Sequence, residues 1–172
     1  MSSAVPRPAN KLLTLVFLLR TQPTPQVLLG YKKRGFAHGR WNGFGGKVEP
    51  NETIREAAVR EMKEESGLLV SNLDEMGVLL FEFVDDPQIW EVHIFRTTHF
   101  SGEMTETEEM RPQWFDQCAV PFDQMWPDDK LWYPFVFNNK YFDGYFKFEG
   151  LSTILEQRLM EREGPCQSNA LE

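Results

Sequence analysis

The apolar positions at the start of the chain predict a pair of buried strands. Residues 12–19 form an apolar run rich in strand-forming side chains, too short for an independent helix. The Pro-bearing segment 21–25 predicts a turn, and residues 27–31 predict the partner strand. A long glycine-rich loop follows over residues 33–47. Because long loops inside compact domains usually serve a site, we expect function there.

Residues 53–66 have the pattern of a helix with defined ends. Thr53 and Glu56 have the spacing of a capping box, and Gly67 stands where a left-handed residue ends a helix. At helical spacing one face collects the apolar side chains that should contact the core. These are Ile54, Ala57 and Ala58.

The second half of the chain predicts more sheet and one more helix. Residues 128–138 have acids in the first turn and apolar side chains at helical spacing, although Pro134 should kink or shorten this helix. Residues 153–162 fit a helix by composition and a strand by position. The predicted strands are 77–84 and 89–100, which form a hairpin, then 110–115 and 141–148.

Length and composition predict one globular domain. The 172 residues, 41% hydrophobic, can bury one substantial core but not two. We expect the domain to span residues 11–162, with a flexible arm at 1–10 and a disordered tail at 163–172.

Charge and cysteine content narrow the partners. A net charge of −8 and a pI near 5.0 argue against a nucleic-acid polymer, which needs a basic surface. No apolar run reaches the length of a membrane span, so no membrane partner is expected. Cys118 and Cys166 fit neither a disulfide framework nor a zinc spacing, which is typical of a reducing compartment and favours a cytoplasmic location.

Three carboxylates occupy the end of the predicted helix 53–66. They lie on the same face that carries the apolar core residues in the first turns of the helix. Like charges at this spacing repel and oppose the helix dipole, at roughly 0.3–1 kcal/mol each where exposed, so local stability does not explain them. Arg60 can pair with acids at i ± 4 on the flank. Alone, the cluster would be typical of a solvated surface; the alternative is a cation site. Its members are Glu61, Glu64 and Glu65.

The spacing around this cluster resembles the Nudix box. The chain has Gly46, five residues, Glu52, seven residues, Arg60-Glu61-Met62, one residue, Glu64-Glu65, one residue and Gly67-Leu68. The resemblance implies a Nudix fold: an α/β/α sandwich with a mixed central β-sheet, in which a loop, a helix and a second loop carry the motif.

A metal-dependent hydrolase is what the resemblance implies. Hard divalent cations bridge carboxylates and phosphate oxygens, so Mg²⁺, with Mn²⁺ able to substitute, would let an acidic cleft take a triphosphate. The catalytic residues would be Glu61, Glu64 and Glu65, with Glu64 and Glu65 both candidates for the base. The metal ligands would be these three, the Gly45 carbonyl and Glu109, for which an exposed surface acid is the alternative.

Further stretches resemble the Nudix members that hydrolyse oxidised purine nucleoside triphosphates. They are 35–36, 39–47, 81–84, 110–115, 125–129 and 144–148. The implied reaction converts 8-oxo-dGTP, 2-hydroxy-dATP and 8-oxo-dATP to monophosphate and diphosphate, which keeps damaged nucleotides out of DNA. O6-methyl-dGTP and N6-methyl-dATP are further candidate substrates. The implied protein is a monomer acting on a small molecule, cytoplasmic and also nuclear, with a mitochondrial fraction.

A purine pocket needs flat apolar walls and a few polar groups that contact the base edge. Trp126, Phe36 and Phe81 can supply walls, and Asn42 offers both donor and acceptor. The neighbouring acids Asp128 and Asp129 should not both ionise easily, so we hypothesise a coupled pair that shares a proton and accepts two kinds of base edge.

The full set of expected substrate contacts is Thr14, Lys32, Phe36, Asn42, Phe44, Gly45, Gly46, Lys47, Phe81, Trp126, Pro127, Asp128 and Asp129. Residues 126–129 have a structural alternative as the N-terminus of the second helix. Two other functions compete: a Nudix hydrolase of ADP-ribose or dinucleoside polyphosphates, and a non-catalytic Nudix binding domain.

Overall fold

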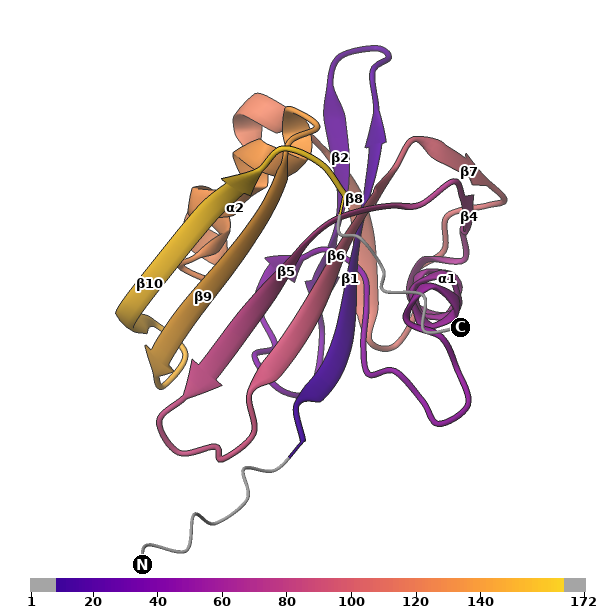
Figure 1. The fold of residues 1–172 in the computed structure, drawn as a ribbon. Coiled ribbons are helices and arrows are strands. Elements are labelled where there is room, and N and C mark those ends of the chain that lie inside the picture. Colours follow the sequence, from indigo (N-terminus) through magenta and orange to yellow (C-terminus); the bar gives the residue numbers. More distant parts are fainter. Residues whose placement is uncertain (1–8, 166–172) are drawn as a thin grey trace, which may run out of the picture.

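A mixed β-sheet lies between two helices in the computed structural model, which describes residues 9–165 (Figure 1). The strands of the sheet are β1 (Lys11–Arg20), β2 (Gln26–Lys32), β3 (Trp41–Asn42), β5 (Asp74–Phe83), β6 (Trp90–Thr97), β8 (Met110–Asp116), β9 (Tyr141–Glu149) and β10 (Thr153–Arg162). The other elements are α1 (Ile54–Ser66), the paired short strands β4 (Leu69–Ser71) and β7 (His99–Ser101), two 3-10 turns at Gln117–Ala119 and Phe122–Gln124, and α2 (Asp129–Phe137).

The strand order is β10-β9-β5-β6-β1-β2-β3, and β8 pairs with β2. β1 runs parallel to β6, and β5 runs parallel to β9, whereas the remaining pairs in this sheet are antiparallel. The mixed sheet expected from the sequence is therefore confirmed.

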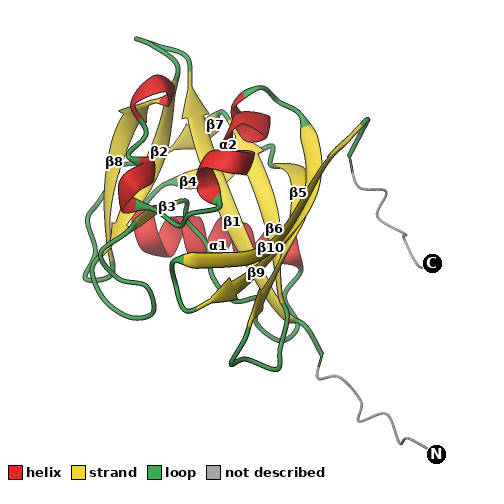
Figure 2. Cartoon of the chain, turned by 90° about the vertical axis from the view of Figure 1, so that its left-hand side faces the viewer, coloured by secondary structure: helices red, strands yellow, loops and turns green. Residues whose placement is uncertain are grey.

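Strand β1 shows how the layers form. Successive side chains of a strand point to opposite faces. Val16 and Leu18 belong to the hydrophobic cluster that includes α1, whereas Phe17 and Leu19 belong to the cluster that includes α2. The continuous apolar run is thus a strand buried on both faces, and the helices cover opposite sides of the sheet (Figure 2). This is the predicted α/β/α arrangement.

Helix α1 begins and ends at its predicted caps. The backbone N–H of Glu56 donates to Thr53 Oγ1 at 3.0 Å, and Gly67 adopts a left-handed conformation with φ of 79°. Ala57 and Ala58 are buried as expected, and so is Met62, which the predicted core face had left out.

Three elements differ from their predicted extent. Residues 153–162, which fitted a helix or a strand, form β10, because they pair along their length with β9. The strand predicted over 89–100 divides, since residues 99–101 leave the main sheet and pair with β4. Helix α2 continues through Pro134 and ends at Phe137.

β1 begins at Lys11 and β10 ends at Arg162. The predicted arm, 1–10, and tail, 163–172, fall mostly outside the described residues and stay predictions. Within residues 9–165, no helix has the length and apolar character needed to cross a bilayer.

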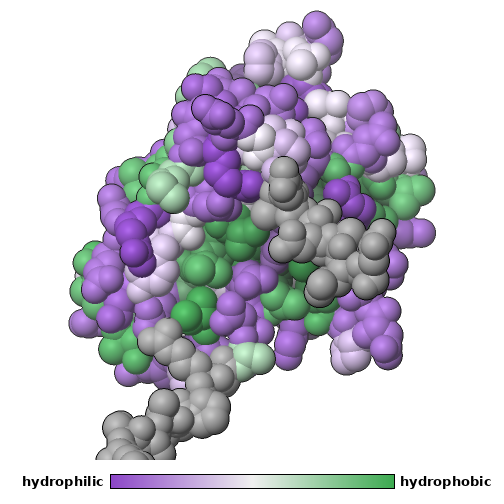
Figure 3. Space-filling model, viewed as in Figure 1, coloured by the Kyte–Doolittle hydropathy of each residue, from purple (hydrophilic) through white to green (hydrophobic). Residues whose placement is uncertain are grey.

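The side of the molecule drawn in Figure 3 carries hydrophilic and hydrophobic residues in a mixture. On strand β6, His93 hydrogen-bonds through Nδ1 to Glu75 at 2.5 Å and through Nε2 to Glu91 at 2.8 Å. Both ring nitrogens of His93 are therefore occupied by carboxylates on the sheet.

Candidate active site

The glycine-rich loop lies beside the first half of β1, where β2 does not pair with it. β2 pairs with β1 only near the end of β1. In its place, the N–H of Thr14 donates to the carbonyl of Gly46 at 2.9 Å, and the N–H of Val16 donates to that of Phe44 at 2.6 Å. The loop therefore forms a backbone surface between the sheet and α1.

Two glycines make this close packing feasible. A Cβ on Gly45 would stand 1.8 Å from the carbonyl oxygen of Thr14, and one on Gly46 would stand 2.6 Å from the carboxyl carbon of Glu61. The N–H of Gly45 donates to Glu65 Oε1 at 2.9 Å. The loop backbone thus meets the carboxylates of α1 directly.

Glu65 is the acid most strongly affected by these surroundings. Burial, together with the charges of Glu61 and Glu109, raises its pKa to about 8, against the opposing effects of the Gly45 N–H and Lys32. Glu61, itself half-buried, also has a raised pKa because of burial. The charges of two further carboxyl groups therefore act on Glu65 beside the glycine loop.

Glu64 lies apart from them in the structure, and the expected convergence of the three glutamates on a metal stays a prediction. Its side chain is 59% exposed and pairs with Arg60 at 3.3 Å. Arg60 binds Glu52 through two hydrogen bonds of 2.6 and 2.9 Å and also bonds Glu61 at 2.9 Å. The buried face of α1 is centred near Ala58, which leaves Glu64 at its outer edge.

The carboxylate oxygens around the loop are the kind of ligand that a divalent cation prefers. Glu61, Glu65 and Glu109 offer hard oxygen ligands, and their mutual repulsion is what a cation would relieve. Within residues 9–165, no three histidine, cysteine or acidic side chains already gather closely enough to hold a metal ion. Metal binding would therefore draw these side chains together.

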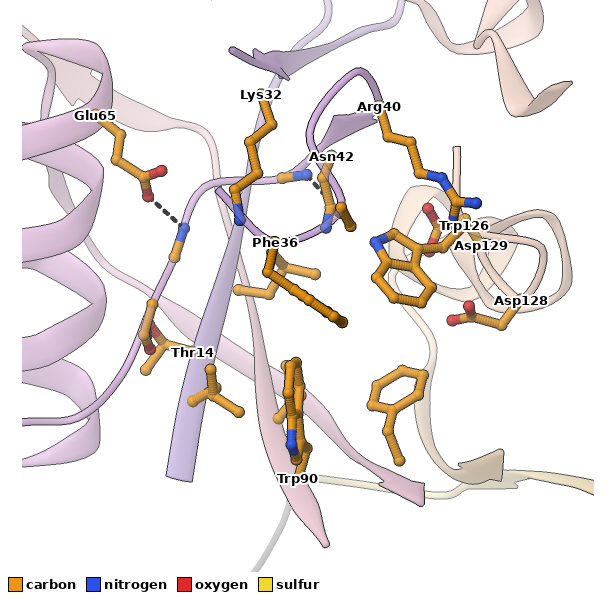
Figure 4. Close-up of a pocket in the computed structure, with 18 of the residues that line it drawn as sticks. Thr14, Lys32, Phe36, Arg40, Asn42, Glu65, Trp90, Trp126, Asp128 and Asp129 are labelled. Atoms are coloured by element: carbon orange, nitrogen blue, oxygen red, sulfur yellow. Dashed lines mark hydrogen bonds between the residues drawn. The ribbon is translucent and has the colours of Figure 1, made fainter. Parts of the chain in front are cut away.

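A cavity of about 230 Å³ extends from the glycine loop into the face covered by α2 (Figure 4). Lys32, Gly45 and Glu65 lie at one end, and Asp128 and Asp129 at the other. The predicted residues that line it are Thr14, Lys32, Phe36, Asn42, Gly45, Gly46, Glu65, Phe81, Trp126, Asp128 and Asp129. Two groups that were assigned from distant parts of the sequence thus share one cavity.

The acid pair is almost fully buried. Asp128 is 1% exposed and accepts a 2.8 Å hydrogen bond from Trp132 Nε1, and Asp129 is 2% exposed. Among the described residues, Asp128 Oδ1 and Asp129 Oδ2 find no hydrogen-bond partner. Burial raises the pKa of Asp128 to about 6, and burial together with the charge of Asp128 raises that of Asp129 well above its ordinary range.

Asn42 stands near these acids with its amide oxygen already engaged. The N–H of Gly43 donates to Asn42 Oδ1 at 2.9 Å, and the Tyr133 hydroxyl donates to it at 3.4 Å. The NH₂ group of Asn42 is thus the part left to donate to a ligand.

Aromatic rings form the walls of the cavity. The Phe36 ring lies 5.3 Å from Trp90 and 5.9 Å from Trp126, and Trp90 lies 4.9 Å from Phe83, measured between centroids. Phe36 is 49% exposed, so this ring stands at the opening.

Among the cavity side chains that sequence reasoning missed are Arg40, Phe83 and Trp90. Phe83 shares a strand face with Phe81, so the alternation along β5 could have revealed it. Nothing local indicated Trp90. Its Nε1 donates to Asp86 Oδ2 at 3.1 Å and Lys11 Nζ lies 4.3 Å from its ring, so it is held as a fixed wall.

Several expected contacts do not line the cavity. Phe44 is fully buried, because the loop places its ring in the hydrophobic cluster that includes α1. Lys47 is exposed and uses its carbonyl to accept from Arg60, and Pro127 lines a neighbouring cavity. The side chains of Glu61, Glu64 and Glu109 also lie outside the cavity lining.

The fold and the site together define the class of protein. In an α/β/α sandwich, a glycine-rich loop packs against the carboxylates of a helix, and an aromatic cavity lies beside them. The chain belongs to the NUDIX domain family, whose model matches residues 11–136. It is 54% identical over 154 residues to the oxidized purine nucleoside triphosphate hydrolase of Danio rerio, covering 90% of this chain and 97% of that protein. The mouse protein of the same name is 52% identical, covering 88% and 96%.

Among solved structures, a mutator MutT protein of Bacillus halodurans matches with a TM-score of 0.76 and 28% identity. The match covers 87% of this chain and 97% of that one. The likeness therefore extends over nearly the whole fold.

Proposed function

We propose that this protein hydrolyses oxidised purine nucleoside triphosphates to the monophosphate and diphosphate, with Mg²⁺ as its metal and Mn²⁺ able to substitute. The observation that carries the proposal is a single cavity with a buried acid pair at one end and the glycine loop with Glu65 at the other. The names of the zebrafish and mouse relatives support the same substrate class.

The acid pair favours a base that offers hydrogen-bond donors. Unpartnered buried oxygens cost free energy, about 1–3 kcal/mol each, which a ligand with matching N–H groups recovers. At neutral pH the raised pKa of Asp129 favours its protonated form, which can donate, while Asp128 accepts. Exchange of that proton would let the pocket accept both 8-oxo-guanine and 2-hydroxy-adenine edges.

Aromatic walls and the Asn42 NH₂ group would complete the recognition of the base. A purine stacked against Trp126 would gain apolar contact, and Asn42 would donate to a base oxygen. In this proposal O6-methyl-dGTP and N6-methyl-dATP are further substrates, because the walls are flat and apolar and accept a methyl group.

At the other end, Lys32 and the N–H groups of the glycine loop would hold the phosphates. A divalent cation bound there would neutralise phosphate charge and lower the pKa of the attacking water. Its ligands would be Glu61, Glu64, Glu65, Glu109 and the Gly45 carbonyl, with Glu64 at the exposed edge of this set. Glu65 takes the proton of the attacking water in this scheme, and the exposure of Glu64 argues against Glu64 as the base.

A substrate panel with diphosphate release as the readout tests the proposal. We expect 8-oxo-dGTP, 2-hydroxy-dATP and 8-oxo-dATP to be turned over with Mg²⁺ at a higher kcat/KM than dGTP, and the methylated purines to be turned over as well. A preference for ADP-ribose, or no turnover with Mg²⁺ or Mn²⁺, would contradict it. Asp128→Asn and Asp129→Asn should each change the ratio of 8-oxo-dGTP to 2-hydroxy-dATP hydrolysis.

The remaining proposals are a monomer, and a cytoplasmic and nuclear protein with a mitochondrial fraction. The net charge of −8 argues against a long nucleic-acid partner, which needs a basic surface, and agrees with a small-molecule partner. Light scattering and imaging of the tagged full chain test the two proposals.

A further inference from the structure

Arg40 occupies a junction between three parts of the structure that carry the base pocket. Its backbone closes the loop that presents Phe36: the N–H of Lys32 donates to the Arg40 carbonyl at 3.0 Å, and the N–H of Gly39 donates to the Lys32 carbonyl at 2.7 Å. The side chain therefore starts at the base of this loop, beside the phosphate end of the cavity.

From there the guanidinium reaches the turn between β9 and β10. Nη1 donates to the Leu151 carbonyl at 2.8 Å, and Nη2 donates to Ser152 Oγ at 3.0 Å. These two bonds fix the plane of the guanidinium group. They connect the loop of Phe36 to a strand pair more than a hundred residues later in the chain.

The fixed guanidinium lies over the ring of Trp126, 4.9 Å from its centroid. Arg40 also lines the cavity and stands near Asp129 in Figure 4. A cation against an indole face is stabilising by about 0.5–2 kcal/mol, and here it restricts the orientation of the wall on which a base would stack.

We propose that Arg40 is a positioning residue of the base pocket, which holds Trp126 in place for stacking and sets the charge environment of the Asp128–Asp129 pair. The inference rests on the proposed function and deepens it. No substrate atom need contact Arg40, since it acts through the indole and through the two carboxyls.

The electrostatic part follows from the groups that face the acid pair. The charge of Arg40 lowers the pKa of both carboxyls, in opposition to the larger effect of burial. From α2 the pair is faced by Trp132, which donates a neutral N–H, and by Tyr133, whose own pKa is raised well above its usual range by burial and by both acids. From β3 it is faced by the neutral amide of Asn42. Arg40 is therefore the charged side chain through which the pair is tuned.

The test measures binding of 8-oxo-dGMP by calorimetry between pH 5 and pH 8, with kcat and KM for 8-oxo-dGTP measured alongside. Arg40→Gln removes the charge, so we expect affinity to fall and KM to rise about three- to tenfold, with kcat within about twofold of the unmodified protein. The pH midpoint of binding should move upward, because the carboxyls lose a stabilising cation.

Arg40→Lys separates the two effects. It keeps a positive charge but not the planar group with its two fixed bonds, so affinity should fall while the pH midpoint stays near that of the unmodified protein. The matched control is Arg20→Gln, which removes an arginine that lies 4.0 Å over the Trp114 ring, away from the cavity lining. Neither affinity nor midpoint should change in this control.

Normal affinity and an unmoved pH midpoint in Arg40→Gln would overturn the inference about Arg40 and leave the proposed function standing. Effects in Arg20→Gln as large as those in Arg40→Gln would do the same. If the unmodified protein neither binds nor hydrolyses oxidised purine nucleotides, the proposed function has failed as well. Near-UV circular dichroism of each variant identifies any that misfold. If Arg40→Gln misfolds, the affinity of Arg40→Lys for 8-oxo-dGMP tests the inference instead.

Discussion

The backbone N–H of Gly45 donates a 2.9 Å hydrogen bond to Oε1 of Glu65. This contact joins the glycine loop to the last turns of α1, although twenty residues separate the two in sequence. It brings a carboxylate and the backbone of the glycine loop together at the end of the cavity that also contains Lys32. Because Glu65 meets the loop and Glu64 does not, substitutions at these two positions can separate the roles of the acids on α1.

Glu65→Gln should abolish most turnover without unfolding the protein. The amide keeps an oxygen to accept from Gly45 and is neutral, as is the protonated carboxyl that a pKa of about 8 favours at neutral pH, so the melting temperature should not fall. Loss of the base and of a metal ligand should lower kcat about a thousandfold. Glu64→Gln is the comparison: its side chain is 59% exposed, and we expect a loss below about tenfold. Similar losses in both variants would contradict the assignment, with steady-state kinetics in Mg²⁺ as the measurement.

Gly45→Ala and Gly46→Ala should fail in different ways. At Gly45 the new methyl group would meet the backbone oxygen of Thr14 at 1.8 Å, so the loop must leave β1, at a cost of about 3 kcal/mol or more. At Gly46 it would meet the side-chain end of Glu61 at 2.6 Å, which can rotate away. That variant should keep its stability within about 1 kcal/mol and lose activity because Glu61 is displaced. Urea unfolding and kinetics distinguish them, and equal destabilisation would count against this account.

How far the sequence predicted the molecule depended on whether local chemistry or tertiary pairing decided each feature. The caps of α1 and the two-sided strand β1 follow from local patterns, and both were predicted. Strand β10 was undetermined because pairing with β9 overrides its helix-compatible composition.

The same distinction holds within the site. Asp128, Asp129 and Asn42 were predicted with their cavity, since the resemblance extended to those stretches. Glu64 was assigned to the same sector as Glu61, but the buried face of α1 is rotated toward Met62, and this rotation depends on packing that the sequence pattern does not contain.

Asp128→Asn should make the protein more stable at pH 8. The folded state raises the pKa of Asp128 to about 6, mainly through burial, above an ordinary value near 3.8. Stability from the protonated carboxyl is therefore complete below about pH 4 and is lost as the pH rises through about 6. The asparagine stays neutral and can still accept from Trp132, so it should gain about 1–3 kcal/mol at pH 8 and little at pH 4.5. Urea unfolding without nucleotide measures the difference; a loss of stability at both pH values would contradict it.

Trp90→Leu should weaken base binding while leaving the chemical step intact. The indole is held at its edge by Asp86 and over its face by Lys11, and it contacts Phe36 and Phe83 within the cavity. Replacing this fixed aromatic wall removes stacking area worth roughly 1 kcal/mol, so KM for 8-oxo-dGTP should rise about fivefold with kcat nearly unchanged. Trp114→Leu is the control, because Trp114 packs against Phe100 outside the cavity lining, and its KM should match the unmodified protein. A lower kcat at unchanged KM in Trp90→Leu would show instead that the ring acts on the phosphate end, which its position among Phe36, Phe83 and Asp86 does not support.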